Sequence, residues 1–72
     1  MKEKIIQIMA EVFEMPINDF PVEISQDSIE NWDSLRHLNL IVELEETFNK
    51  SFNPEDIAEM TSLEKIMDFL SN

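Results

Sequence analysis

The chain has 72 residues and a formal net charge of -11, with 16 acidic and 5 basic side chains. A domain of this length buries only about 60% of the surface that its unfolded chain exposes, which leaves little room for an enclosed catalytic cleft. The negative charge would repel nucleic acid phosphates and anionic lipid headgroups. Cysteine and glycine are both absent, which excludes disulfides, cysteine chemistry and glycine-rich phosphate loops. We therefore expect one acidic domain, residues 1–72, that is not an enzyme and binds no nucleic acid.

No apolar run approaches the roughly 18 residues that a membrane-spanning helix needs. The first residues, Met1 to Gln7, also lack the apolar core of a signal peptide. We expect a cytoplasmic monomer without a membrane span.

The first predicted helix runs from the N-terminus to near Met15. Its apolar residues recur at helical spacing and share one side, namely Ile5, Ile6, Ile8, Met9, Val12 and Phe13. Pro16 closes this helix, because the residue before a proline is disfavoured in the α region. Residues 16–33 show no sustained period and predict a long loop. Scattered apolar side chains could anchor it: Ile17, Phe20, Val22, Ile24, Ile29 and Trp32.

The second predicted helix opens at Asp33, a favoured N-cap residue, and runs to Phe48. One apolar stripe is typical of a core-facing side and consists of Leu40, Ile41, Leu44 and Phe48. A second stripe lies about a third of a turn away and consists of Leu35, Leu38 and Val42, bordered by Asn39, Glu45 and Glu46. An apolar strip edged with carboxylates suits docking to a basic partner with an apolar groove. Spacing alone equally allows the next helix to cover this strip.

A short helix from Pro54 to about Met60 follows, with Asn53 as its cap. The last helix is predicted to start at Thr61, with Thr61 and Glu64 as a capping box. It buries Leu63, Ile66, Met67 and Leu70. The sequence thus predicts an all-α fold, a small four-helix bundle of three main helices and one short helix.

The segment Asp33-Ser34-Leu35 opens a helix after a long loop, in the middle of a small acidic domain. This segment resembles the modification site of the acyl carrier protein family. The resemblance extends over the whole chain: first helix, long loop, the helix that starts with Asp-Ser-Leu, short third helix and final helix. A bare tripeptide would be weak evidence, whereas the same tripeptide in this context is specific.

The resemblance implies that Ser34 accepts phosphopantetheine from coenzyme A, in a reaction catalysed by a separate magnesium-dependent phosphopantetheinyl transferase. Asp33 and Leu35 would complete the recognition of Ser34. The thiol of the arm would hold acyl groups as thioesters. Two physical features fit this: the first turn of a helix favours a phosphate, and Asp33 stabilises the helix by about 1 kcal/mol as its N-cap. The negative charge of Asp33 opposes the phosphate, and the resemblance suggests that Asp33 also helps to bind the transferase's metal.

The resemblance also implies partner-binding positions on the second helix: Leu38, Val42, Glu45, Glu46, Arg36 and Asn39. The partners would be the transferase and acyl-activating and acyl-transfer enzymes with basic docking surfaces. Arg36 and Asn39 stand where carriers of fatty acid synthesis are usually acidic, and Trp32 stands where they commonly have glycine. These departures favour a carrier of a specialised pathway, such as polyketide, peptide or surface-saccharide assembly, over bulk fatty acid biosynthesis.

Three alternatives remain open at the level of sequence. An aminoacyl or peptidyl carrier would share the fold, and a non-covalent acidic helical adaptor would use the apolar strip alone. His37 follows Ser34 at a spacing of i, i+3, which would suit a nucleophile and its base, but no orienting acid or oxyanion loop accompanies the pair. We instead expect His37 to lie at the core margin, with hydrogen bonding to the phosphate as a further hypothesis. No metal site is expected, because residues 27–38 lack the glycine and final glutamate of a calcium loop.

Overall fold

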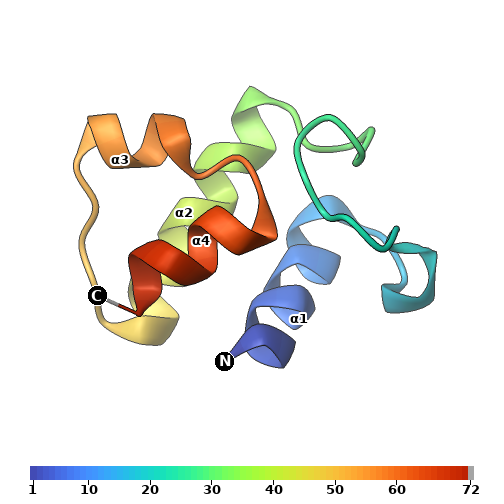
Figure 1. The fold of residues 1–72 in the computed structure, drawn as a ribbon, viewed down its shortest axis with the longest axis horizontal. Coiled ribbons are helices and arrows are strands. Elements are labelled where there is room, and N and C mark those ends of the chain that lie inside the picture. Colours follow the sequence, from blue (N-terminus) through green and yellow to red (C-terminus); the bar gives the residue numbers. More distant parts are fainter. Residues whose placement is uncertain (72) are drawn as a thin grey trace.

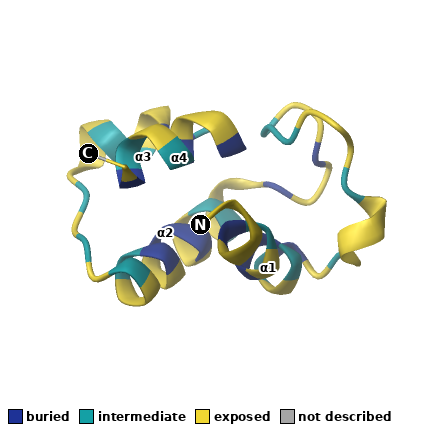
Figure 2. Cartoon of the chain, turned by 60° about the horizontal axis from the view of Figure 1, so that its bottom comes forward, coloured by how far each residue is buried: buried dark blue, intermediate teal, exposed yellow. Residues whose placement is uncertain are grey.

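A computed structural model describes residues 1–71. Its helices are α1 (Lys2–Phe13), the single-turn 3-10 helix η1 (Ile17–Asp19), α2 (Ser34–Phe48), α3 (Pro54–Glu59) and α4 (Leu63–Leu70). The helices α1 and α2 pack against each other, and α3 and α4 lie over them as a second layer, with the long loop at one end (Figures 1 and 2). The predicted all-α fold of three main helices and one short helix is confirmed.

The core unites side chains from every main helix and from the long loop. Its buried members are Ile5, Ile8, Met9, Phe13, Ile29, Trp32, Leu40, Ile41, Leu44, Met60, Leu63, Ile66 and Leu70. The apolar stripes predicted for the three main helices face this core, with Ile6, Val12, Phe48 and Met67 at its margin. Among the described residues no polar or charged side chain is buried.

The first helix ends two residues before the predicted end. Phe13 is its last residue, and Glu14 adopts the left-handed conformation with φ 55° and ψ 49°. The N–H of Met15 then donates to the Ala10 carbonyl at 3.0 Å, a closure that usually employs glycine at the left-handed position. Asn49 ends α2 in the same conformation, and there the Lys50 N–H donates to the Glu45 carbonyl at 3.0 Å. The chain makes both turns without any glycine.

Only part of the long loop is anchored as predicted. Ile29 and Trp32 are buried, and Phe20 and Ile24 are partly buried against the core. By contrast, Val22 is fully exposed and Ile17 is about half exposed, so the prediction that these two side chains anchor the loop is wrong. The loop is also tied to the start of α4, because the Leu63 N–H donates to the Ile24 carbonyl at 2.9 Å.

The predicted caps are confirmed for two helices and wrong for the third. Asn53 caps α3 by accepting a hydrogen bond from the Asp56 N–H. The cap of α4 is Ser62, whose hydroxyl accepts from the Lys65 N–H at 3.1 Å, and not Thr61. The predicted capping box of Thr61 and Glu64 is therefore absent. The backbone of Thr61 is engaged elsewhere, since its carbonyl accepts from the Gln26 N–H and its N–H donates to the Glu59 carbonyl.

Candidate functional site

Ser34 is the first residue of α2, and its side chain is exposed to solvent. The helix points its N-terminus toward the end of the long loop, at the edge of the bundle (Figure 1). Within residues 1–71 neither the Ser34 hydroxyl nor the N–H groups of Ser34 and Leu35 make a hydrogen bond. Two free amides at the positive end of a helix dipole lie beside a reachable hydroxyl, an arrangement that favours a phosphate on this oxygen.

Asp33 is the N-cap of α2, as predicted. Its Oδ1 accepts a hydrogen bond from the Arg36 N–H at 2.8 Å, and its backbone carbonyl accepts from the His37 N–H. The residue is exposed, and its second carboxylate oxygen has no partner within residues 1–71. The cap therefore leaves one oxygen of Asp33 accessible beside Ser34.

The second apolar stripe of α2 is exposed. Leu35 is 69% exposed, Leu38 55% and Val42 52%, values far above those of the core-facing stripe. The alternative that α3 covers this strip is wrong, since all three residues are more than half exposed. We call these three residues the docking strip. An exposed apolar strip next to a reachable serine is typical of a surface that contacts other proteins.

The polar residues that border the docking strip differ in their solvent exposure and in their hydrogen bonds. Glu46 and Asn39 are exposed. Glu45 is partly buried, and its Oε2 accepts a hydrogen bond from the Phe52 N–H at 2.9 Å, which ties the segment before α3 to α2. Glu45 thus has a structural bond that the sequence pattern did not indicate.

Arg36 is turned away from the docking strip toward α1. Its Nη1 donates to the Val12 carbonyl at 3.0 Å, and its Nη2 lies 3.3 Å from the Glu14 carboxylate. The Asn31 side chain donates to the adjacent Phe13 carbonyl at 2.9 Å. Together these side chains satisfy the last carbonyls of α1, so the structure gives Arg36 a role in closing that helix.

His37 forms a bridge that sequence reasoning missed. Its Nδ1 lies 2.9 Å from the indole Nε1 of Trp32, and its Nε2 lies 2.7 Å from the Ile57 carbonyl. Because an indole N–H can only donate, Nδ1 must accept and Nε2 must carry the proton. The two rings stack at 6.0 Å, and Trp32 also packs on Phe13 at 5.0 Å.

This bridge joins the loop before Ser34, α2 and α3 through one imidazole ring. Both ring nitrogens are occupied within the protein, so His37 is placed neither to deprotonate Ser34 nor to bind a phosphate on it. The hypothesis of a phosphate contact from His37 has no support in this geometry. One feature of the sequence could have pointed to this bridge: a buried tryptophan needs a hydrogen-bond acceptor for its indole N–H.

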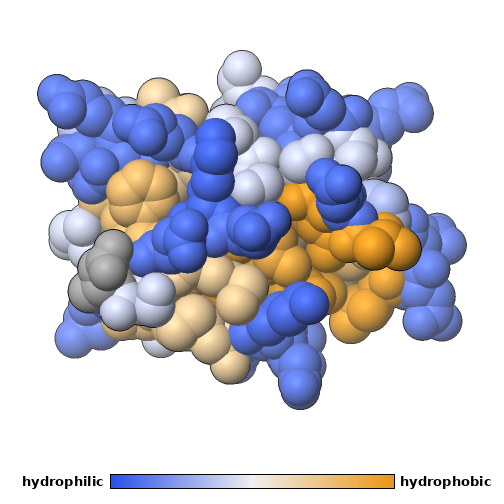
Figure 3. Space-filling model, viewed as in Figure 1, coloured by the Kyte–Doolittle hydropathy of each residue, from blue (hydrophilic) through white to orange (hydrophobic). Residues whose placement is uncertain are grey.

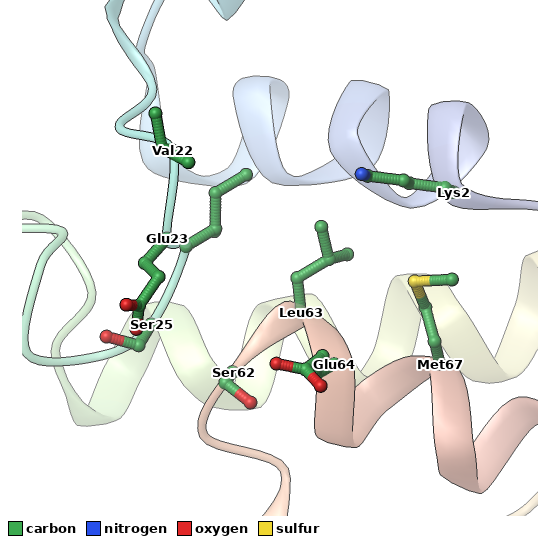
Figure 4. A pocket seen from close by; sticks show the side chains of 9 residues that line it. Lys2, Val22, Glu23, Ser25, Ser62, Leu63, Glu64 and Met67 are labelled. Atoms are coloured by element: carbon green, nitrogen blue, oxygen red, sulfur yellow. The ribbon is translucent and has the colours of Figure 1, made fainter.

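A groove of about 390 Å³ lies on another face, between the start of α1, the long loop and α4 (Figure 4). The apolar surface around Val22, Leu63 and Met67 faces Lys2 across it, with Glu23 and Glu64 at its edge. Figure 3 shows a strongly apolar patch on this side of the molecule. Ser34 is not among the residues that line this groove.

Within residues 1–71 no group of three or more His, Asp or Glu side chains is arranged to hold a metal ion. No helix in the described part of the chain is long and apolar enough to cross a membrane.

A helical bundle that presents an exposed hydroxyl beside an uncovered, acid-edged apolar strip defines a carrier domain. Residues 3–70 match the model of the family described as phosphopantetheine attachment site, so the chain belongs to that family. A search of curated proteins found no similar sequence. The chain is therefore a phosphopantetheine carrier domain, and its prosthetic group is covalently attached phosphopantetheine. Carrier domains of this family are generally non-catalytic and interact with transferases and biosynthetic enzymes.

Proposed function

We propose that Ser34 bears the phosphopantetheine arm and that the chain carries acyl intermediates between enzymes of a specialised biosynthetic pathway. The observation that carries the assignment is the exposed Ser34 hydroxyl on the first turn of α2, next to two free amides and the docking strip. The remaining serines lack this combination, since none of them opens α2 beside the docking strip.

The attachment reaction uses the Ser34 oxygen as the nucleophile. A transferase removes its proton, the oxygen forms a bond to the phosphorus next to the pantetheine, and adenosine bisphosphate leaves from coenzyme A. The free amides at the start of α2 stabilise the resulting phosphodiester. When bound, the arm supplies a thiol that carries acyl groups as thioesters, which this cysteine-free chain lacks.

The partner surface is the docking strip with the acidic side chain of Glu46 at its edge, and Leu35 and Asp33 complete the recognition of Ser34. Loss of the apolar contacts at Leu38 or Val42 would weaken docking without unfolding the domain, because both side chains already lie in solvent. The basic docking surfaces of acyl-activating and acyl-transfer enzymes complement this acidic domain.

The specialised pathway is favoured by the start of α2. Arg36 forms an ion pair with Glu14, and Asn39 is uncharged. This part of the helix therefore offers a basic partner fewer carboxylates than the carriers of bulk fatty acid synthesis do. The same features suit an aminoacyl or peptidyl carrier, which an adenylating enzyme would load. The mass of the native thioester separates the two.

Intact mass spectrometry tests the assignment. The chain is incubated with coenzyme A, magnesium and a broad-specificity phosphopantetheinyl transferase, and we expect a mass gain of one phosphopantetheine. Ser34→Ala should abolish the gain, whereas Ser51→Ala, which removes another exposed hydroxyl, should keep it. No gain on the wild type, under conditions that modify a known carrier, would favour the non-covalent adaptor instead.

A further inference from the structure

A shallow groove of about 360 Å³ runs between α1 and α2, beside the docking strip. It is lined by Glu11 and Val12 from α1 and by Asn39, Val42 and Glu43 from α2. Val42 belongs to both surfaces and is 52% exposed. The docking strip therefore continues over the edge of α2 and onto α1.

The groove combines an apolar floor with two uncompensated carboxylates. Val12 and Val42 supply the floor, while Glu11 and Glu43 are exposed and neither forms an ion pair or hydrogen bond within residues 1–71. The basic side chain at this helix seam, Arg36, is held by the Val12 carbonyl and by Glu14. Within the described residues, therefore, no positive charge neutralises the carboxylates of Glu11 and Glu43.

We propose that this groove receives a lysine or arginine side chain of the phosphopantetheinyl transferase, which makes α1 a part of the docking surface. This inference rests on the proposed function. Long basic side chains lay their aliphatic stem on apolar surface and keep the charged head among polar groups. Here the stem covers Val12 and Val42, and the head meets Glu11 and Glu43, with the Asn39 amide oxygen as a further acceptor.

The charge of the chain excludes the simplest competing occupant. A second copy would bring a net charge of -11 to a groove that is itself acidic, so self-association through this face is opposed by repulsion. A metal ion is a poor fit as well, since the described residues offer no third carboxylate or histidine here and the floor is apolar. An organic cation attached to a partner protein matches both the floor and the rim.

Steady-state kinetics of Ser34 modification test the inference. The double variant Glu11→Gln/Glu43→Gln should raise the transferase's KM for the carrier roughly two- to thirtyfold, the range of two exposed charge pairs. Its kcat should stay unchanged, because the variant alters binding and leaves Ser34 and its neighbours intact. Glu64→Gln removes the same charge from α4 and should leave KM at the wild-type value.

Two further measurements separate docking from folding. The double variant should keep the wild-type melting temperature, since both carboxylates lack partners within residues 1–71. Glu43→Lys should raise KM further through repulsion. Adding transferase to the ¹⁵N-labelled wild type should shift the amide signals of residues 11, 12, 39, 42 and 43. An unchanged KM in both variants, with these amides unmoved, would overturn the inference while modification of Ser34 itself still upholds the proposed function.

Discussion

Replacing His37 with alanine removes a side chain that connects the loop before Ser34, α2 and α3. The Trp32 indole N–H, in a side chain only 3% exposed, then loses its acceptor. An unsatisfied buried donor costs about 1–3 kcal/mol. The Ile57 carbonyl is affected less, because it also accepts from the Met60 N–H at 3.2 Å. The lost ring stack adds roughly 0.5–1 kcal/mol.

These contributions add up to a loss of about 2–4 kcal/mol in the free energy of unfolding. A chain of this length has only about 4–11 kcal/mol in total. Since each kcal/mol shifts the midpoint of so small a domain by roughly 4–8 °C, the melting temperature should fall by at least about 8 °C. The loss should appear in urea unfolding followed by the fluorescence of Trp32, the single tryptophan of the chain.

Leu38→Ala is the matched control, because it truncates the neighbouring residue, which is 55% exposed, and should cost less than about 0.5 kcal/mol. Trp32→Phe removes the donor and should be coupled to His37→Ala by about 0.5–3 kcal/mol in a double-mutant cycle. All members of the cycle are followed by circular dichroism, because Trp32→Phe also removes the fluorophore. ¹⁵N NMR of the wild-type ring should show the proton on Nε2. If His37→Ala unfolds with the same midpoint as Leu38→Ala, the bridge does not hold the fold together.

Three other perturbations follow from the ends of the helices. Asp33→Ala should lower the free energy of unfolding by about 1 kcal/mol in chemical denaturation, and Asp33→Asn by only a few tenths. If the transferase modifies Ser34 of the Asp33→Asn variant at the wild-type rate, Asp33 acts only as a cap. Glu14→Gly should stabilise the chain by about 0.5–1 kcal/mol, because φ 55° strains a residue with a Cβ, and a lower melting temperature would contradict this. Arg36→Met should lower the free energy of unfolding by about 1–2 kcal/mol in urea, since the Val12 carbonyl loses a charged donor. Glu14→Gln, at the exposed end of the ion pair, should change it by less than about 0.5 kcal/mol. Equal losses in the two variants would assign the effect of Arg36 to the ion pair.

Local rules in the sequence sufficed to locate the helices and to place Ser34 at the start of α2. The helical spacing of apolar residues located all three main helices, and short-range chemistry located the caps Asp33 and Asn53, because a cap bonds to an amide only three residues away. The end of α1 was misplaced because Pro16 is a local signal, whereas the true end depends on Asn31 and Arg36, which reach its last carbonyls from 18 and 24 residues away.

The tertiary structure alone decided which surfaces stay uncovered and which polar side chains are already occupied. Spacing placed Leu35, Leu38 and Val42 on one side of a helix, but only the folded structure shows that these residues stay more than half exposed. Likewise, residue types offered His37, Arg36 and Glu45 as candidates for chemistry or docking, and the fold engages each with a backbone group or ring from another part of the chain. A pattern along one helix records what that helix can present, whereas burial and hydrogen bonding depend on segments that folding brings together from distant parts of the chain.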